Sequence, residues 1–284
     1  RTLIPHLQGQ PDSDKPVAEL WFGAHPGDPS TVDDRLLNEV IAEDPAGQLG
    51  SRVSAEYGER LPFLLKVLAA EEPLSLQAHP SKEQAEEGFA RENAAGIELT
   101  APNRNYKDDN HKPELIVALT DFYAMAGFRP LARTRELFAA LECPELDHYV
   151  AMLDEDPSVT TESANLRVLF TTWITIPSAK RKELIAAIVS AGERLIAADP
   201  ADWKSRVMST VLELNQRYPG DIGVLGALLL NHIELSPGEA VYLDAGQLHA
   251  YVSGLGVEIM ANSDNVLRGG LTPKFVDVPE LVKV

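Results

Sequence analysis

The chain alternates between two hydrophobic periodicities, and the changes between them indicate its organisation. Before residue 129, short apolar runs and alternation with a period of two predict β-strands. These strands are expected at residues 18–22, 63–68, 114–120 and 122–128. Strand-like patterning resumes after Gly220, with a strand at 240–243 and another that begins at His249. Gly254 and Gly256 supply the backbone freedom that a tight hairpin needs soon afterwards.

Helical spacing of apolar residues dominates the middle of the chain. The helices predicted there span roughly residues 131–141, 162–172, 178–197 and 201–216. Residues 33–59 show the same spacing with a break at 45–47, and Ser81 with Gln84 has the form of a capping box that starts a helix ending near Asn93. We therefore expect two domains. Their predicted bounds are residues 1–130 with 219–284 for a discontinuous β-rich domain, and 131–218 for a helical domain inserted into it.

Residues suited to metal binding lie beside the predicted strands. Gln77 and His79 share one face of an extended strand because alternate side chains point the same way. The same rule pairs Lys112 with Glu114, although Pro113 makes the strand less regular. With His249, two imidazoles, a carboxylate and an amide oxygen suit Zn²⁺, Fe²⁺ or Mn²⁺. A single histidine beside an apolar run is more commonly a structural hydrogen-bonding residue, so spacing alone leaves both interpretations open.

The net charge narrows the class of partner. The 284-residue chain carries a formal charge of −18, which would repel nucleic acids and anionic membranes. Several cations nevertheless fall within or near the candidate motifs, and a basic pocket in an acidic protein suits a small anionic substrate. These residues are Lys66, His111, Lys112, Arg268 and Lys274. For Lys66, a strand end or a snorkelling side chain explains the position equally well.

Cysteine content and hydropathy indicate the compartment. Cys143 is the only cysteine, so no intrachain disulfide can form, and a reducing cytoplasm is expected. The longest apolar run, residues 222–230, is shorter than the ~18 residues that a membrane span needs. The sequence also lacks a recognisable secretory signal, and we expect a cytoplasmic monomer.

Several longer strings stand out along the chain: Pro73–Pro80, Asn110–Glu114, His249–Tyr251, Ser263–Arg268 and Thr272–Lys274, with a further signature at Glu19–Pro26. These strings resemble those of type I phosphomannose isomerases, a family of the cupin superfamily. Together they cover nearly the whole chain, and each is long and uncommon. The resemblance implies a mainly β fold with α-helices, in which a cupin double-stranded β-helix, or jelly roll, carries an inserted helical domain. It also implies further sequence on both sides of the chain.

The resemblance also assigns site residues. It implies one Zn²⁺ per chain, a principal catalytic role for Arg268, and a pocket lined by further polar residues. The implied metal ligands are Gln77, His79, Glu114 and His249, and the implied pocket residues are Lys112, His111, Glu258 and Asp264. The residues themselves suggest the substrate contacts: Ser75 shares the strand face of Gln77, Lys274 suits a phosphate as a point charge, and Lys66 would need an anionic partner if buried. Because a guanidinium stays protonated, Arg268 is expected to stabilise charge. Glu258 and His111 are the leading proton-transfer candidates, and the sequence does not decide between them.

The implied reaction interconverts mannose 6-phosphate and fructose 6-phosphate through a cis-enediolate, with a sugar phosphate as the small-molecule partner. Two other functions stay open. His79, His249 and Glu114 also form the two-histidine, one-carboxylate set of Fe²⁺ oxygenases, although Gln77 and the basic motifs weigh against that class. A non-catalytic cupin that binds a sugar phosphate around a structural metal is the other alternative.

Overall fold

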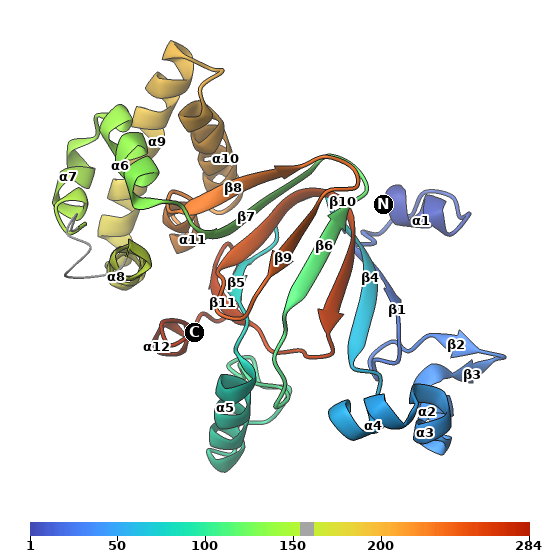
Figure 1. The fold of residues 1–284 in the computed structure, drawn as a ribbon. Helices are drawn as coiled ribbons and strands as arrows, with labels where there is room; N and C mark the ends of the chain where they lie inside the picture. Colours follow the sequence, from blue (N-terminus) through green and yellow to red (C-terminus); the bar gives the residue numbers. More distant parts are fainter. Residues whose placement is uncertain (154–161) are drawn as a thin grey trace.

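Antiparallel strands form the centre of the molecule, a computed structural model that describes residues 1–153 and 162–284 (Figure 1). The long strand β10 (His249–Ala261) joins two groups of strands, because its first half pairs with β5 and β7 and its second half with β4 and β6. The group around the second half contains β1 (Glu19–Phe22), β4 (Phe63–Ala70), β6 (Glu114–Ala118) and β9 (Ala240–Leu243). The group around the first half contains β5 (Leu76–Ala78), β7 (Phe122–Phe128), β8 (Leu230–Leu235) and β11 (Leu267–Gly270).

Strand β10 continues through Gly254 and Gly256, so the hairpin expected at these glycines is wrong. The glycines instead permit close approach of neighbouring strands. A Cβ atom at Gly254, where φ is +124°, would lie 2.7 Å from the carbonyl oxygen of Asp121. A Cβ atom at Gly256 would lie 2.8 Å from Cγ1 of Ile116. Any larger residue would therefore force apart the strands that meet where β10 passes from one group to the other.

Helices from the middle of the chain gather on one side of the strands (Figure 1). They are α6 (Leu131–Leu141), α7 (Pro144–Val150), α8 (Glu162–Thr175), α9 (Ser178–Ala198), α10 (Trp203–Arg217) and α11 (Ile222–Gly226). Trp173, Leu137 and Met208 from these helices share a buried apolar cluster with Leu76 of β5 and Met125 of β7. Because burial of each such side chain contributes about 1.5–3 kcal/mol, this cluster holds the helices against the strands.

The remaining helices lie towards the other side of the strands or below them in the same view, except the short C-terminal helix, which lies at the lower left near β11 (Figure 1). They are α1 (Leu3–Leu7), α2 (Leu37–Glu43), α3 (Pro45–Leu49), α4 (Ser51–Tyr57), α5 (Lys82–Ala94) and α12 (Val278–Leu281). The capping box of Ser81 and Gln84 is confirmed. The helical pattern is interrupted next to residues 45–47: α2 ends at Glu43, and Pro45 starts the separate helix α3, in which the Asp44 side chain accepts the Gly47 N–H.

The first residues of the helical stretch predicted at 33–59 do not form a helix. A two-stranded hairpin of β2 (Thr31–Val32) and β3 (Arg35–Leu36) precedes α2. Its turn residues Asp33 and Asp34 have φ of 49° and 62°, a conformation that acidic residues adopt more readily than bulky apolar ones. The helical spacing therefore describes the chain correctly only from Leu37 onwards.

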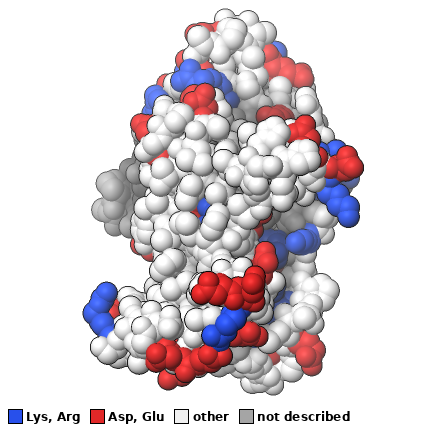
Figure 2. Space-filling model, turned by 90° about the vertical axis from the view of Figure 1, so that its right-hand side faces the viewer, with Lys and Arg blue, Asp and Glu red and all other residues white. Residues whose placement is uncertain are grey.

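The mixed fold class of antiparallel strands and helices is confirmed, and the helices expected in the middle of the chain are present. The division into two domains at residues 131 and 218 stays a prediction. No helix within residues 1–153 and 162–284 is long and apolar enough to cross a membrane. Figure 2 shows acidic side chains gathered over the lower part of one face, in keeping with the net charge of −18.

Candidate metal centre

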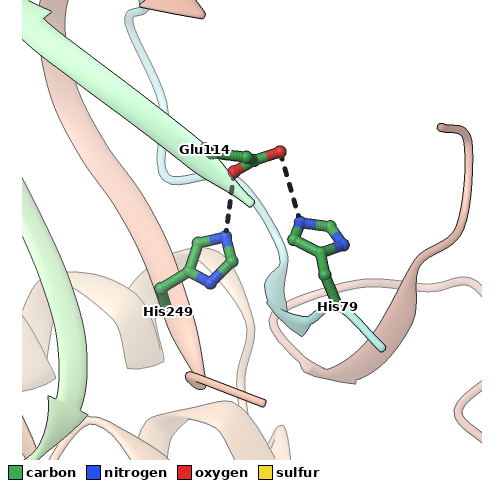
Figure 3. A group of neighbouring side chains, drawn as sticks. All are labelled: His79, Glu114 and His249. Carbon is green, nitrogen blue, oxygen red and sulfur yellow. Dashed lines mark ion pairs between the residues drawn. The ribbon is translucent and has the colours of Figure 1, made fainter. Parts of the chain in front are cut away.

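Three predicted ligands converge from three different strands. His79 directly follows β5, Glu114 begins β6 and His249 begins β10. Their candidate ligand atoms all lie within 4.8 Å of one another, and all three side chains are buried. Nε2 of His79 lies 3.3 Å from Oε1 of Glu114, and Nε2 of His249 lies 3.4 Å from Oε2 (Figure 3). The carboxylate therefore lies between the two imidazoles.

The hydrogen bonds of this group leave its inward atoms unsatisfied. Nδ1 of His79 lies 2.8 Å from the carbonyl oxygen of Asn265, and Nδ1 of His249 lies 2.8 Å from that of Gln247. A carbonyl only accepts, so each Nδ1 carries a proton, and in the tautomer with a single ring proton each Nε2 turns a lone pair towards Glu114. Both Nε2 atoms and Oε2 of Glu114 are buried without a hydrogen-bond partner. Three hydrogen-bond acceptors that face one another repel unless a cation lies among them. These three atoms therefore fit the ligands of a metal ion.

Gln77 and Arg268 extend the same face of the strands. Gln77 on β5 lies directly opposite His249 on β10 and directly opposite Arg268 on β11. Directly opposed residues point to the same side of a sheet, so Gln77 stands between the metal centre and Arg268. Arg268 is partly buried, and burial lowers its pKa. Ser75, two residues before Gln77, is also partly buried.

Lys112 supplies the positive charge next to the triad. Its Nζ lies 3.2 Å from Oε1 of Glu114. Burial opposes the charge on Lys112, but the carboxylates of Glu114 and Glu258 outweigh burial and raise its pKa. Burial likewise opposes the charge on Glu114, whose pKa Lys112 and His79 hold well below its usual value. Burial and Lys112 lower the pKa of His79 to about 4, so its imidazole is neutral at pH 7 and able to bind a metal.

A second carboxylate, Glu258, lies across the strand pair from Lys66. Oε2 of Glu258 is 3.8 Å from Nζ of Lys66, and Oε1 accepts a 2.8 Å hydrogen bond from the Tyr251 hydroxyl. Burial and the negative charge of Glu114 raise the pKa of Glu258 to about 7. A carboxyl group with this pKa exchanges a proton near neutral pH, as a general acid or base must. Lys66 is buried and also lies 3.5 Å from Oε1 of Glu19.

The other predicted site residues are more exposed. His111 is partly buried, and Lys274 is exposed. Asp264 is exposed and lies 3.2 Å from Nε2 of His25, and the described residues show no ion pair between Asp264 and Arg268. The structure thus brings Lys112, Glu258 and Lys66 into one charge network with the triad, whereas Asp264 contacts a different partner.

The sequence did not single out four residues that contact the predicted site residues. Tyr251, Glu19 and His25 lie within strings that carried the family resemblance, but no spacing rule connects them with Glu258, Lys66 or Asp264. Asn265 contacts His79 through a backbone carbonyl, which leaves no signal in residue type. A signal for Tyr251 was available, because it shares a strand face with His249 two residues earlier.

Comparisons with known proteins converge on one family. A model described as the catalytic domain of type I phosphomannose isomerase matches residues 4–131. The mannose-6-phosphate isomerase of Escherichia coli (strain K12) is 42% identical over 99% of this chain and 70% of that protein. The corresponding protein of Bos taurus is 39% identical over 97% of this chain and 64% of its own length.

Solved structures agree with the sequence relatives. Mannose 6-phosphate isomerase from Salmonella typhimurium, in a crystal structure bound to substrate and a zinc atom, matches with a TM-score of 0.84 at 38% identity. The match covers 99% of this chain and 69% of that one. The chain is therefore similar over nearly its whole length to about two thirds of these proteins.

Proposed function

This chain belongs to the type I phosphomannose isomerase family and shares its cupin fold, and we propose that it interconverts mannose 6-phosphate and fructose 6-phosphate at a zinc site. The reaction moves a carbonyl between C1 and C2 of the sugar. It requires removal of a carbon-bound proton, proton transfer between oxygens and stabilisation of the negative charge on a cis-enediolate.

The observation that carries the proposal is the set of buried, unpartnered atoms that face one another: Nε2 of His79, Nε2 of His249 and Oε2 of Glu114. We propose that these residues hold Zn²⁺ together with Gln77, whose strand position opposite His249 places it on the same face. Zinc in such a site supplies Lewis-acid polarisation of substrate oxygens. The same donor set would suit the Fe²⁺ of an oxygenase, but the relatives are isomerases, and neither that function nor non-catalytic sugar-phosphate binding is favoured.

Proton transfer is assigned to Glu258. Its buried carboxyl group has a pKa raised to about 7, so it can both accept and return a proton near neutral pH. His111 is the weaker candidate because it is only partly buried. Tyr251 holds the Glu258 carboxylate in one orientation through its 2.8 Å hydrogen bond. Lys112 keeps positive charge beside Glu114 and Glu258.

Charge stabilisation is assigned to Arg268. Its guanidinium projects from β11 on the face that carries Gln77, where a planar fork can contact two oxygens of an enediolate. Lys274 is exposed and suits a phosphate group as a point charge. Lys66, Ser75 and Asp264 complete the proposed substrate pocket, with Lys66 nearer the carboxylates of Glu19 and Glu258. We further propose that the protein acts as a cytoplasmic monomer and binds neither nucleic acid nor membranes.

The test is product analysis by NMR. Purified zinc-loaded protein is incubated with [2-¹³C]mannose 6-phosphate, and the spectrum is followed until it stops changing. The C2 resonance of fructose 6-phosphate, mainly that of its cyclic hemiketal, is expected, together with return to mannose 6-phosphate when the labelled product is the starting material. Protein with stoichiometric zinc that leaves both sugar phosphates unchanged would exclude the proposed function for this chain.

A further inference from the structure

A cavity of about 710 Å³ lies on the opposite side of the strands from the metal centre. It is bounded by α10, by the residues around the start of α6 and by parts of β7, β8 and β10. Strand β10 separates the two sites, because Tyr251 packs in the apolar cluster on the metal side whereas Val252 packs in the cluster shared with the helices. A ligand in this cavity would therefore not occupy the catalytic pocket.

The side chains that line the cavity carry more positive than negative charge. The charged residues that line it are Arg129, Arg133, Arg206, Glu213 and Glu234. Glu213 lies 3.4 Å from Nε of Arg217, and Glu234 accepts a 3.2 Å hydrogen bond from the Tyr123 hydroxyl. Arg133 lies 3.1 Å from Oε2 of Glu136, so Arg129 and Arg206 are the lining arginines without an ion pair to a described residue. A cationic cavity is unexpected in a protein with a net charge of −18.

Arg129 is the least compensated of these cations. It is 5% exposed, and its guanidinium donates to the carbonyl oxygens of Leu228 at 3.0 Å and Leu230 at 2.7 Å. Within the described part of the chain, no carboxylate lies within ion-pair distance of it. Burial, together with the like charge of Arg133, lowers the pKa of Arg129 to about 10. An anion bound beside this group would offset the cost of burying an unpaired charge.

Trp203 organises the arginines around the cavity. The guanidinium carbon of Arg133 lies 4.1 Å from the centre of the Trp203 ring, and that of Arg129 lies 5.5 Å from it. Two planar guanidinium groups held against one ring present fixed donor forks, which suit the oxygens of phosphates and carboxylates. We propose that this cavity is a second binding site, for a small oxyanion of the phosphate or carboxylate class, formed by Arg129, Arg133 and Arg206.

The test uses inorganic phosphate and succinate as probes of the two chemical classes. Zinc-loaded protein is titrated with each anion while saturating fructose 6-phosphate fills the catalytic pocket, and tryptophan fluorescence reports on Trp203. A saturable change with at least one anion is expected. The double variant Arg133→Gln, Arg206→Gln should lower the affinity for that anion at least tenfold. Trp203→Phe should remove the change in fluorescence. Arg52→Gln with Arg194→Gln changes two arginines that do not line the cavity, and this control should leave the affinity unchanged.

The responding anion identifies the class of ligand. A saturable response to phosphate alone assigns a phosphate ligand, and a response to succinate alone assigns a carboxylate ligand. Three results would overturn the proposed anion site. They are no saturable change in fluorescence with either anion, an affinity in the Arg133→Gln, Arg206→Gln variant equal to that of the unaltered protein, or a fluorescence change that persists in Trp203→Phe. The test does not need Arg129 to be replaced, so a folding defect at that buried residue cannot obscure the answer.

A separate observation concerns Asn265, which contacts a proposed metal ligand. Its backbone carbonyl accepts the 2.8 Å hydrogen bond from Nδ1–H of His79, and its side chain is fully buried. The side-chain Oδ1 accepts the backbone N–H groups of Lys107 at 2.7 Å and Asp108 at 3.2 Å. Its Nδ2 donates to the carbonyl oxygens of Asp108 at 2.9 Å and Asn110 at 2.8 Å.

These bonds fix the carbonyl that orients His79. The Asn265 amide is held by the loop that leads to Lys112, so its backbone cannot move without breaking several buried hydrogen bonds. We infer that Asn265 is a positioning residue that sets the tautomer and ring orientation of His79 for metal binding. This inference rests on the proposed zinc site, although its test does not depend on isomerase activity.

The test measures zinc affinity by competition with a chelator. Asn265→Asp keeps the side-chain volume but loses the Nδ2 donors, and Asn265→Ala removes the side-chain bonds entirely. Both variants should lower the affinity for zinc about 10- to 100-fold, which is the usual effect of losing the hydrogen-bond support of a metal-bound histidine. Ser263→Ala is a milder variant that removes the hydroxyl accepting the Asn265 backbone N–H at 3.2 Å, and a smaller loss is expected. Unchanged zinc affinity in well-folded variants would overturn the inference.

The control is Asn105→Ala. Asn105 is also buried and begins the same loop, but its side chain bonds Glu92 and Asp277 and no proposed metal ligand. This variant should lower the melting temperature of the metal-free protein while leaving zinc affinity within about threefold of the unaltered chain. An equal loss of zinc affinity would mean that general loosening of the loop explains the effect. Absence of isomerase activity in the unaltered protein would count against the proposed function and not against this result.

Discussion

The hydroxyl of Tyr251 donates a 2.8 Å hydrogen bond to Oε1 of Glu258, and both side chains are buried. Burial and the carboxylate of Glu258 hold the pKa of Tyr251 well above its usual value, so the phenol keeps its proton and acts only as a donor in this pair. The bond stabilises the ionised form of Glu258 and partly offsets the effects that raise its pKa. Tyr251 therefore affects the pH at which Glu258 can accept a proton.

Replacing Tyr251 by Phe should move the acidic limb of the pH profile upwards. Without the donated hydrogen bond the pKa of Glu258 rises, so less of the carboxylate is ionised near pH 6. We expect kcat/KM to fall about tenfold at pH 6 and by less at pH 8. Tyr242→Phe, which changes an exposed tyrosine on β9, should leave the profile in place. A uniform fall at every pH would show that Tyr251 does not act through Glu258.

Glu258 should cost the metal-free protein stability above neutral pH. Its pKa is raised from the usual 4.5 to about 7, so the folded state binds more protons than the unfolded state between these values. Stability conferred by this group is therefore fully present below pH 4.5 and is lost as the pH rises through 7. Glu258→Gln should be more stable than the unaltered protein at pH 8, by about 1–3 kcal/mol, and similar to it at pH 5. Urea unfolding at both pH values measures this, and a pH-independent difference would contradict the assigned environment.

Arg268 should affect the chemical step more than substrate binding. If its guanidinium stabilises the developing enediolate, Arg268→Ala should lose about 10²- to 10³-fold in kcat with a modest change in KM or zinc content. Arg268→Lys should recover little, because an ammonium lacks the planar fork. Steady-state kinetics and thermal melts together separate catalysis from folding. Near-normal kcat in a well-folded Ala variant would remove Arg268 from the mechanism.

The phosphate group should dominate substrate recognition. Lys274 is exposed and accessible to an anion. The kcat/KM for mannose 6-phosphate should be at least about 10²-fold higher than that for free mannose, because the neutral sugar cannot make a charge-assisted contact. Lys274→Gln should reduce this preference. Lys180→Gln, which changes an exposed lysine on α9, is the control and should leave the preference unchanged. Comparable kcat/KM values for the two sugars would contradict the assignment of Lys274 to phosphate binding.

Much of the fold could be predicted from hydrophobic periodicity. The helix at Leu131–Leu141 was predicted at its observed bounds because its apolar stripe and flanking residues agree. The sequence pattern was misleading where close packing determines the backbone path. Gly254 and Gly256 indicated a turn, but they instead allow neighbouring strands to approach closely. Periodicity also failed at residues 31–36, where a short hairpin has too few residues to establish its own period.

The site could be predicted only through the resemblance to a family. Spacing within one strand connected Gln77 with His79, but nothing in the sequence measures the 3.4 Å between His249 and Glu114, which depends on how β6 and β10 pair. Contacts through backbone atoms, such as Asn265 with His79, are independent of side-chain type and therefore leave no trace in the sequence. The partner of Asp264 was unexpected for a similar reason, because His25 is 239 residues away.

The most direct test of the zinc-site mechanism is a titration of metal-free protein with Zn²⁺, with bound zinc measured by elemental analysis and isomerase activity by a coupled assay at each point. Activity should rise linearly with bound zinc and saturate at one zinc per chain. His249→Ala should lose both zinc binding and activity, because removing one imidazole leaves Glu114 and His79 without a complete donor set. Full activity in zinc-free protein, or stoichiometric zinc retained by His249→Ala, would contradict the zinc-site mechanism.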